Sequence, residues 1–388
     1  MSERVVVVHD YLTQRGGAER VVLALMKAFP SARLVTSIYD RETTYPEFAN
    51  YDIETLWLDR IRPLQRDPRR ALPLLARAFS SYEVRNADFV VCSSSGWAHG
   101  VRTDAPKIVY CHNPPRWLHQ TEDYVADQGL PARLMLDVLR RPLTRWDRAA
   151  AASATAYLAN SSVVAGRIES TYGIEADVVP PPVMIDQTGR LHAIPGLEPG
   201  FLLTVSRARG YKNAEAVATA VQQLLPDQRL VVVGGLPEHP DGGTWGPRVV
   251  GATGVSDAHL RWLYANCSAL VAVSYEDFGL TPLEANTFGR PTLCLRAGGY
   301  LDTLLPGRTG LFVEDPTPAA VAAAVHTFKT VDWSESAIRA HAQRFSPEVF
   351  ASRLRSVADE VRGLVPAKQL VPQARVALDL ESIEGVAS

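Results

Sequence analysis

The sequence predicts an α/β protein made of two Rossmann-like domains, each with a doubly wound parallel sheet. Short apolar segments of strand length alternate with helical patterns along most of the chain, which is typical of parallel sheets covered by helices on both faces. The alternation stops in a proline- and glycine-containing segment at 180–200 and then starts again. The 388 residues are too many for one ordinary core, so we expect two domains that face each other across a cleft.

We expect the N-terminal domain to span 1–185 and the C-terminal domain to span 198–346, with 180–200 as the linker. Both contain a series of apolar segments that end in polar or glycine residues, as buried parallel strands do. The strands predicted for the first domain are 4–9, 33–38, 89–92, 107–111, 156–159 and 176–179, and those predicted for the second are 200–205, 228–233, 249–250, 270–274 and 291–295.

A long helical pattern follows the second domain. Ser346 is a suitable N-cap and Pro347 fits the first helical position, so a helix is predicted at 347–364. The remaining tail, 365–388, lacks strong periodicity, and we expect it to be loosely held.

Composition narrows the class of protein. A net charge of -2 does not favour nucleic-acid binding. No apolar run reaches the roughly 18 residues of a membrane span, and the first predicted strand begins too early for a signal peptide, so we expect a cytoplasmic protein. The four cysteines lack the spacing of metal ligands, and we interpret them as reduced packing residues.

The segment EDFGLTPLE, 276–284, contains the clearest candidate site. Glu276 follows a predicted strand, and Gly279 permits a tight turn before a new helix. The free amide groups near Gly279, Leu280 and Thr281 would face an anion such as a diphosphate at the helix N-terminus. Carboxylates beside such an anion are better suited to accept hydrogen bonds from sugar hydroxyls than to bind the anion.

Glu284 has two possible roles in this helix. The pattern predicts Thr281 as the N-cap, Pro282 as the first helical residue and Glu284 as the third. In that position Glu284 would close a capping box with its own helix end. It would alternatively bind a ligand hydroxyl, and this segment alone does not decide between the two interpretations.

Three further groups of candidate residues follow predicted strands. Gly16 and Gly17 precede a helix and would let a ligand approach the backbone, although a double glycine is first of all a turn. His112 precedes two prolines that stiffen its loop, although a lone histidine at a strand end is usually a satisfied polar residue. Arg207 and Lys212 flank a helix start and would neutralise the two phosphates of a nucleoside diphosphate, although such charges are elsewhere simply solvated.

Together these strings resemble the motifs of the family-four retaining glycosyltransferases with the GT-B fold. EDFGLTPLE is similar to the two-glutamate signature of that family, and CHNPPR resembles its CHxPxR segment. HDYL followed by GGAER resembles the N-terminal motif of bacterial GDP-mannose-dependent mannosyltransferases that assemble surface polysaccharide of the O-antigen type. The resemblance covers about residues 1 to 360, and its motifs occur in the family's order.

The resemblance implies a role for each candidate residue. Glu276 would contact the donor hexose, Glu284 would hold the nucleotide ribose, and His112 would lie beside the hexose near the reacting centre. The residues implied at the donor diphosphate are Gly16, Gly17, Arg207, Lys212 and the amides of Gly279, Leu280 and Thr281.

The resemblance also implies the reaction. A hexose, with mannose from GDP-mannose favoured, would be transferred with retention from a nucleoside diphosphate sugar to an acceptor hydroxyl, without a metal or other cofactor. The N-terminal domain would bind the acceptor, a saccharide or a lipid-linked saccharide, and the helix at 347–364 would cross back to brace that domain. Basic and apolar residues alternate within 60–77 and 133–148, which favours peripheral contact with the inner face of a membrane, although solvated helix faces show the same pattern.

Other functions remain compatible with the sequence. A UDP-sugar-dependent glycosyltransferase acting on a small natural product would carry the same motifs. A nucleotide-sugar epimerase would share the architecture but would change the donor without any acceptor. A pyridoxal phosphate-dependent phosphorylase and a catalytically silent sugar-nucleotide-binding protein are further alternatives, although no clear lysine context supports the first of these two.

Overall fold

The computed structural model describes residues 3–61, 63–64, 71–119, 130–206 and 213–363. Two of the candidate residues, Arg207 and Lys212, and the tail at 365–388 lie outside the described residues.

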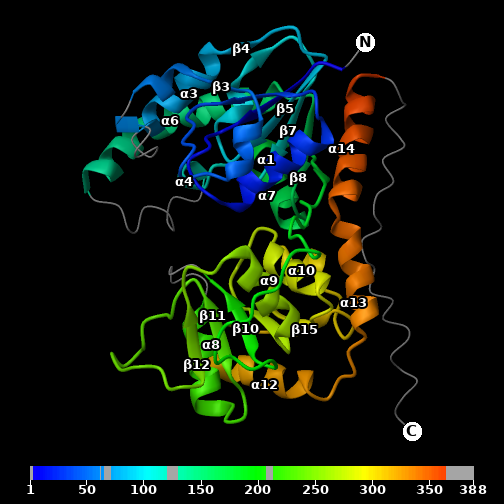
Figure 1. Ribbon diagram of the computed structural model, residues 1–388. Helices are drawn as coiled ribbons and strands as arrows, with labels where there is room; N and C mark the ends of the chain where they lie inside the picture. Colours follow the sequence, from blue (N-terminus) through cyan, green and yellow to red (C-terminus); the bar gives the residue numbers. More distant parts are fainter. Residues whose placement is uncertain (1–2, 62, 65–70, 120–129, 207–212, 364–388) are drawn as a thin grey trace.

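The N-terminal half folds into a seven-stranded parallel sheet with the strand order β3-β2-β1-β5-β7-β8-β9 (Figure 1). Its strands are β1 (Val5–His9), β2 (Arg33–Thr36), β3 (Ile53–Thr55), β5 (Phe89–Ser94), β7 (Lys107–Cys111), β8 (Ala156–Ala159) and β9 (Asp177–Val178). Its main helices are α1 (Gly17–Ala28), α3 (Leu72–Ser81), α4 (Arg116–His119), α6 (Leu130–Ala152) and α7 (Ser162–Tyr172), with short 3₁₀ helices that include η2 (Trp57–Arg60) and η4 (Ala98–Gly100).

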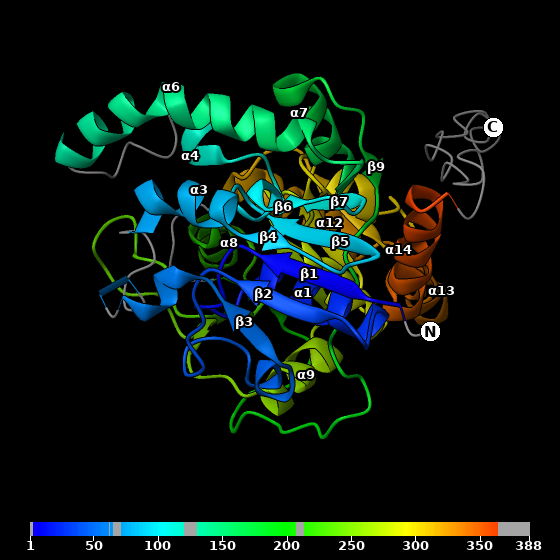
Figure 2. The ribbon, with the colours of Figure 1, turned by 90° about the horizontal axis from the view of Figure 1, so that it is seen from above.

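Helices cover both faces of this sheet because its central strands are apolar on both sides. Along β1, Val6 and Val8 point into a core shared with α3, α6 and α7, while Val5 and Val7 point into a core shared with α1. Figure 2 shows α6 and α7 on one side of the sheet and α1 on the other. A separate two-stranded sheet joins β4 (Glu83–Val84) to β6 (Arg102–Thr103) at the margin of the domain.

The C-terminal half repeats this arrangement with six parallel strands in the order β12-β11-β10-β13-β14-β15. Its strands are β10 (Leu202–Val205), β11 (Leu230–Val233), β12 (Val249–Ala252), β13 (Ala269–Ala272), β14 (Thr292–Leu295) and β15 (Gly310–Val313). Its helices are α8 (Ala214–Thr219), which continues into a π-helical turn at Ala220–Leu224, α9 (Asp257–Asn266), α10 (Leu280–Thr287), α11 (Tyr300–Thr303), α12 (Pro318–Phe328) and α13 (Glu335–Ala342).

Here α8 and α12 pack on one face of the sheet, and α9 and α10 pack on the other. The predicted fold class, two Rossmann-like parallel-sheet domains, is therefore confirmed. The segment 180–200 contains neither helix nor strand.

A final helix, α14 (Pro347–Val361), returns from the second domain to the first. The predicted cap is confirmed, because the Ser346 hydroxyl accepts a hydrogen bond from the amide of Val349 at 3.4 Å. Phe350, Leu354 and Val357 lie in the same core as α1, so this helix belongs to the packing of the N-terminal domain. Figure 1 shows α14 alongside that domain, above α13.

The described residues contain no helix that is both long enough and apolar enough to cross a membrane. All four cysteines, Cys92, Cys111, Cys267 and Cys294, are buried and unpaired with one another, in agreement with their interpretation as packing residues.

Candidate functional site

The carboxyl ends of strands from both sheets meet at Asp277. This residue lies in the loop after β13, and its carboxylate accepts hydrogen bonds from Asn113 at 3.0 Å and from Arg167 at 2.6 Å. It also pairs with Arg116. Asn113 and Arg116 belong to the loop and short helix that follow β7, so the His112 loop and the Glu276 loop are tied together across the two domains.

Glu276 is held at the edge of this junction. Its carboxylate accepts a hydrogen bond from the hydroxyl of Ser274 at 3.0 Å, and its carbonyl accepts one from the amide of Gly299 at 2.9 Å. Gly298 has a φ of 62°, and a Cβ there would clash with the Glu276 carbonyl. The loop after β14 therefore holds the backbone of Glu276 in place while its side chain stays partly exposed.

The helix after this loop begins earlier than the sequence predicts. Gly279, with a φ of 83°, is the N-cap, and Leu280 is the first residue of α10, so the prediction of Thr281 as N-cap is wrong. The reason is tertiary, because Gly279 lies so close to the ring of Tyr300 that any Cβ would clash with it. The first amides of the helix, at Leu280 and Thr281, still lack intrahelical partners, and their N–H groups point out of the N-terminus of the helix.

Glu284 does not close a capping box. It lies in the second turn of α10, and its side chain is 7% exposed. One carboxylate oxygen accepts a hydrogen bond from Arg20 of α1 at 2.8 Å, and the other accepts one from the Tyr264 hydroxyl at 2.6 Å. Burial favours a lower pKa for Arg20, but the charge of Glu284 and the contact with Tyr45 outweigh it, so the pKa of Arg20 is raised. Glu284 therefore joins the two domains as an ion pair.

The two N-terminal glycines differ in what surrounds them. A Cβ at Gly16 would lie 2.5 Å from the Glu19 carboxylate, so this glycine makes room for a side chain of its own helix. A Cβ at Gly17 would meet nothing within 4 Å. Gly17 therefore begins α1 beside open space, which a ligand can enter next to the helix N-terminus.

His112 lies at the carboxyl end of β7, next to Ser93 of the adjacent strand β5, with His9 of β1 on the other side of Ser93. Its Nε2 is 2.8 Å from the hydroxyl of Ser93, and the same hydroxyl is 3.1 Å from Nδ1 of His9. Burial, followed by the nearby charge of His9, lowers the pKa of His112 to about 3. His112 is therefore a neutral imidazole at physiological pH.

The pKa of His9 shifts in the opposite direction. Burial alone favours a lower pKa, but the carboxylate of Glu19, 4.0 Å from Nε2, and that of Asp10 together raise the pKa of His9 above its ordinary value. Burial also opposes the ionised form of Glu19, yet the contact with His9 lowers its pKa overall. A buried ion pair thus lies behind His112.

A second carboxylate crosses between the domains at Asp302 of α11. It accepts hydrogen bonds from the amide of Ser162 at 2.7 Å and from the Ser162 hydroxyl at 2.6 Å, at the start of α7. A negative charge at a helix N-terminus is favourable, so this contact reinforces the junction made by Asp277.

The structure thus brings His112, Glu276 and the start of α10 to one junction, and it places Gly17 and Glu284 at the adjoining contact between α1 and α10. It does not describe Arg207 and Lys212, although the flanking Ser206 follows β10 and Asn213 precedes α8 at the same edge of the sheet. No group of three or more His, Cys, Asp or Glu side chains in the described part of the chain is arranged to hold a metal ion.

Sequence reasoning did not single out the residues that connect these candidates: Asp277, Arg20, His9, Glu19 and Ser93. His9, Glu19 and Arg20 lie inside the HDYL and GGAER strings, so their presence in a motif was a usable signal. Asp277 stands between Glu276 and Phe278, and nothing in its local pattern indicates an interdomain contact.

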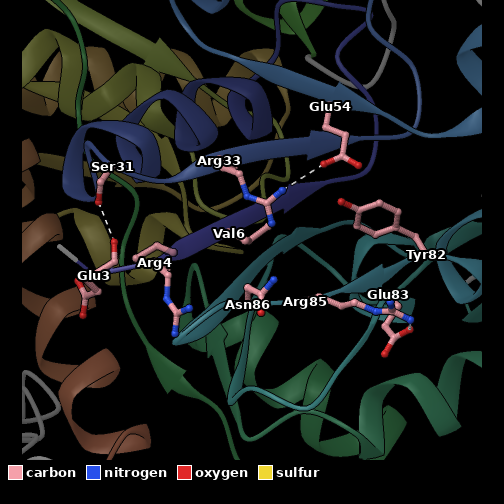
Figure 3. Close-up of a pocket in the computed structure, with 11 residues that line it drawn as sticks. Glu3, Arg4, Val6, Ser31, Arg33, Glu54, Tyr82, Glu83, Arg85 and Asn86 are labelled. Atoms are coloured by element: carbon pink, nitrogen blue, oxygen red, sulfur yellow. Dashed lines mark hydrogen bonds and ion pairs between the residues drawn. The ribbon is translucent and has the colours of Figure 1, made fainter. Parts of the chain in front are cut away.

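A cavity of about 470 Å³ lies elsewhere in the described part of the chain (Figure 3). It is at the amino ends of β1 and β2, opposite the edge that carries the candidate residues. Its three arginines already pair with carboxylates of the chain: Arg4 with Asp88, Arg33 with Glu54 and Arg85 with Glu83. We therefore assign it no part in the candidate site, because ligands of open parallel sheets bind at the carboxyl ends of the strands.

Fold and site together define a class: two Rossmann-like domains whose carboxyl edges face each other, with polar loops from both at the junction, as in GT-B glycosyltransferases. The family model for glycosyltransferase family 4 matches residues 15–187, and the one for glycosyl transferases group 1 matches residues 192–344. Each model covers one of the two domains. The chain therefore belongs to the group 1 and family 4 superfamily of GT-B glycosyltransferases.

Individual proteins agree with this assignment. The chain is 37% identical over 71 residues to alpha-1,3/1,6-mannosyltransferase ALG2 of Dictyostelium discoideum, an alignment that covers 18% of this chain and 17% of that protein. Alignments with the curated relatives span between 17% and 52% of their own lengths.

Solved structures of the same fold match over nearly the whole chain. Sucrose-phosphate synthase from Thermosynechococcus elongatus has a TM-score of 0.67 at 18% identity, covering 94% of this chain and 100% of that one. Anabaena HepE in complex with UDP-glucose has a TM-score of 0.64 at 17% identity, covering 91% of this chain and 98% of that one. At these identities the likeness shows the fold.

Proposed function

We propose that the protein is a retaining, metal-independent hexosyltransferase that moves a hexose from a nucleoside diphosphate sugar to an acceptor hydroxyl. The observation that supports this most is the junction at Asp277. It places the imidazole of His112, from the N-terminal domain, beside the loop of Glu276, from the C-terminal domain. Two substrates held by different domains would meet at such a junction.

The donor would occupy the C-terminal side. Glu276, oriented by Ser274, would accept hydrogen bonds from the hexose hydroxyls. Glu284, whose two oxygens also accept from Arg20 and Tyr264, would accept them from the ribose through its remaining lone pairs. Arg207 and Lys212, with the amides of Gly279, Leu280 and Thr281 and the open backbone at Gly17, would stabilise the charge that develops on the departing diphosphate. Stabilisation of this kind is worth several kcal/mol in enzymes that use oxyanion holes, about 2.7–4 kcal/mol for one donor.

The transfer would take place on one face of the sugar. The bond between the anomeric carbon and the diphosphate oxygen breaks, and a bond from the anomeric carbon to the acceptor oxygen forms. The acceptor proton passes to the departing phosphate oxygen. Neither glutamate would act as a nucleophile, and neutral His112 would donate a hydrogen bond at the reacting centre.

For the donor, we propose GDP-mannose. The partial likeness to an alpha-1,3/1,6-mannosyltransferase supports a mannosyl donor, and the resemblance of the N-terminal motif points the same way. The likeness in fold to HepE, whose structure holds UDP-glucose, supports UDP-glucose as the second candidate. Thermal shifts with GDP-mannose, GDP-glucose, UDP-glucose and UDP-galactose would rank the donors, because a ligand that binds the native state raises its stability.

For the acceptor, we propose a lipid-linked saccharide, with a small natural product as the alternative. The N-terminal domain exposes Trp57, Ile61 and Leu74, and η2 contacts α3 so that these side chains belong to neighbouring elements. Arg60 and Arg77 on the same two elements are exposed. An apolar and cationic surface of this kind fits an anionic membrane. Co-sedimentation with phosphatidylglycerol vesicles, but not with phosphatidylcholine vesicles, is the expected result.

The decisive assay combines the best donor with polyprenyl-diphosphate-linked saccharides in the presence of EDTA. Transfer with an unchanged anomeric configuration, followed by NMR of the product, is the expected outcome. A changed sugar with donor alone would indicate an epimerase. Activity lost in EDTA and restored by Mg²⁺ or Mn²⁺ would refute metal independence, and donor binding without any transfer would indicate a sugar-nucleotide-binding protein.

A further inference from the structure

A chain of polar contacts runs from the buried start of α1 to His112. Glu19 lies 4.0 Å from Nε2 of His9, and Nδ1 of His9 lies 3.1 Å from both the carbonyl and the hydroxyl of Ser93. The Ser93 hydroxyl lies 2.8 Å from Nε2 of His112. Glu19, His9 and Ser93 are 1%, 2% and 0% exposed, so water does not compete for these contacts.

The direction of each hydrogen bond follows from the Ser93 carbonyl. A carbonyl oxygen only accepts, so Nδ1 of His9 must carry the proton that it shares with Ser93. The Ser93 hydroxyl therefore accepts from His9, and its own proton is available for Nε2 of His112. Because His112 is neutral, a ring that accepts at Nε2 carries its proton at Nδ1.

The negative charge of Glu19 supports this assignment of the His9 protons. A neutral His9 protonated at Nδ1 would turn the lone pair of Nε2 toward the Glu19 carboxylate, which is unfavourable. Protonation of both ring nitrogens removes that repulsion, which agrees with the raised pKa of His9. The charged groups that act on His9 are Glu19 and Asp10, and those that act on His112 are His9, Glu19 and Asp277.

We infer that Glu19, His9 and Ser93 are positioning residues that hold His112 as the neutral tautomer protonated at Nδ1. No residue in the described part of the chain accepts a hydrogen bond from that Nδ1, and the side chain is partly exposed beside Asp277. His112 thus presents one donor to an oxygen of a ligand in the junction. The inference rests on the proposed function, because it gives His112 its task at the reacting sugar.

The tautomer is directly measurable in the full-length protein. Side-chain ¹⁵N NMR, with the His112 signals assigned by their loss in His112→Gln, reports which ring nitrogen is protonated. The expected wild-type result is a protonated Nδ1 and an unprotonated Nε2. Ser93→Ala should bring in the tautomer protonated at Nε2. A protonated Nε2 in the wild type, or an unchanged tautomer in Ser93→Ala, would overturn the inference.

Kinetics with matched variants test whether the positioning of His112 matters for sugar transfer. Ser93→Ala should lower kcat by roughly 10-fold to 100-fold, the range seen when the hydrogen-bond partner of a metal-ligating histidine is removed, with little change in donor KM. Ser93→Thr keeps the hydroxyl and should recover most of the activity. Ser94→Ala is the control, because Ser94 is an adjacent buried serine whose hydroxyl contacts His99 at 3.0 Å.

Failure of the inference and failure of the proposed function give different results. If the wild type transfers sugar and Ser93→Ala is as active as Ser94→Ala, the positioning role is wrong and the transferase function stands. If the wild type transfers no sugar to any acceptor, the function fails and the NMR spectrum still decides the tautomer. Thermal melts of each variant show whether a loss of activity reflects unfolding.

Discussion

Replacement of Asp277 by asparagine should loosen the contact between the two domains. The Asp277 carboxylate is 17% exposed and pairs with Arg116, which is 51% exposed, and with Arg167, which is 20% exposed. The more exposed pair contributes about 0.2–1 kcal/mol, and the better shielded one about 1–2 kcal/mol. Loss of the negative charge should therefore cost about 1–3 kcal/mol of interdomain free energy, a shift of about 5-fold to 150-fold between closed and open arrangements.

Distance measurements between spin labels would follow this shift. Cysteines introduced at exposed Arg148 on α6 and Lys329 after α12 provide one label in each domain, and the four native cysteines are buried. Asp277→Asn should broaden the interdomain distance distribution toward longer values, without donor present. Asp88→Asn is the control, because Asp88 forms an ion pair of the same kind with Arg4 inside the N-terminal domain.

The transfer activity of Asp277→Asn should fall as the open arrangement becomes more populated, because His112 and Glu276 would then spend less time close to each other. Saturating donor should recover part of the closed population if the donor bridges the domains. A distance distribution for Asp277→Asn that matches the wild type, at both low and physiological salt, would refute the reasoning that this carboxylate ties the domains together.

Three other predictions have defined outcomes. Gly16→Ala should lower the melting temperature, because its Cβ would lie 2.5 Å from a buried carboxylate, whereas Gly17→Ala should melt like the wild type and lose donor affinity by calorimetry. Equal melting temperatures for the two variants would contradict the packing argument. Gly279→Ala should be destabilised in urea by about 1–3 kcal/mol, since the residue has a φ of 83° and faces an aromatic ring; a stability within 0.5 kcal/mol (about the scatter of neutral surface changes) would contradict it. The pKa of His112 is lowered to about 3 from an ordinary value of 6.5, so the unfolded chain gains a proton first as pH falls. The stability that the neutral His112 contributes to the fold is therefore lost as the pH falls from 6.5 to about 3. His112→Gln should flatten the dependence of the unfolding free energy on pH in that window. An unchanged slope in the variant would show that His112 is not neutral in the fold.

Local patterns predicted most of the elements that form this fold. The strand predicted at 200–205 is β10 (Leu202–Val205), and the helix predicted at 347–364 is α14 (Pro347–Val361). These predictions held because apolar strands and capped helices are encoded by neighbouring residues. The predicted start of α10 was wrong by two residues, because Gly279 takes the N-cap position. Its left-handed backbone packs against the ring of Tyr300, and no local sequence pattern reveals that contact.

By itself the sequence determined the two α/β halves, the strand ends that carry His112 and Glu276, and the motif resemblance that groups them. Only the tertiary structure decided what these residues touch. Arg20 meets Glu284 across 264 residues, Asn113 meets Asp277 across 164, and His9 meets Ser93 across 84. The physical reason is that periodicity reports which face of an element is buried, whereas a hydrogen bond between domains depends on how two separate sheets face each other.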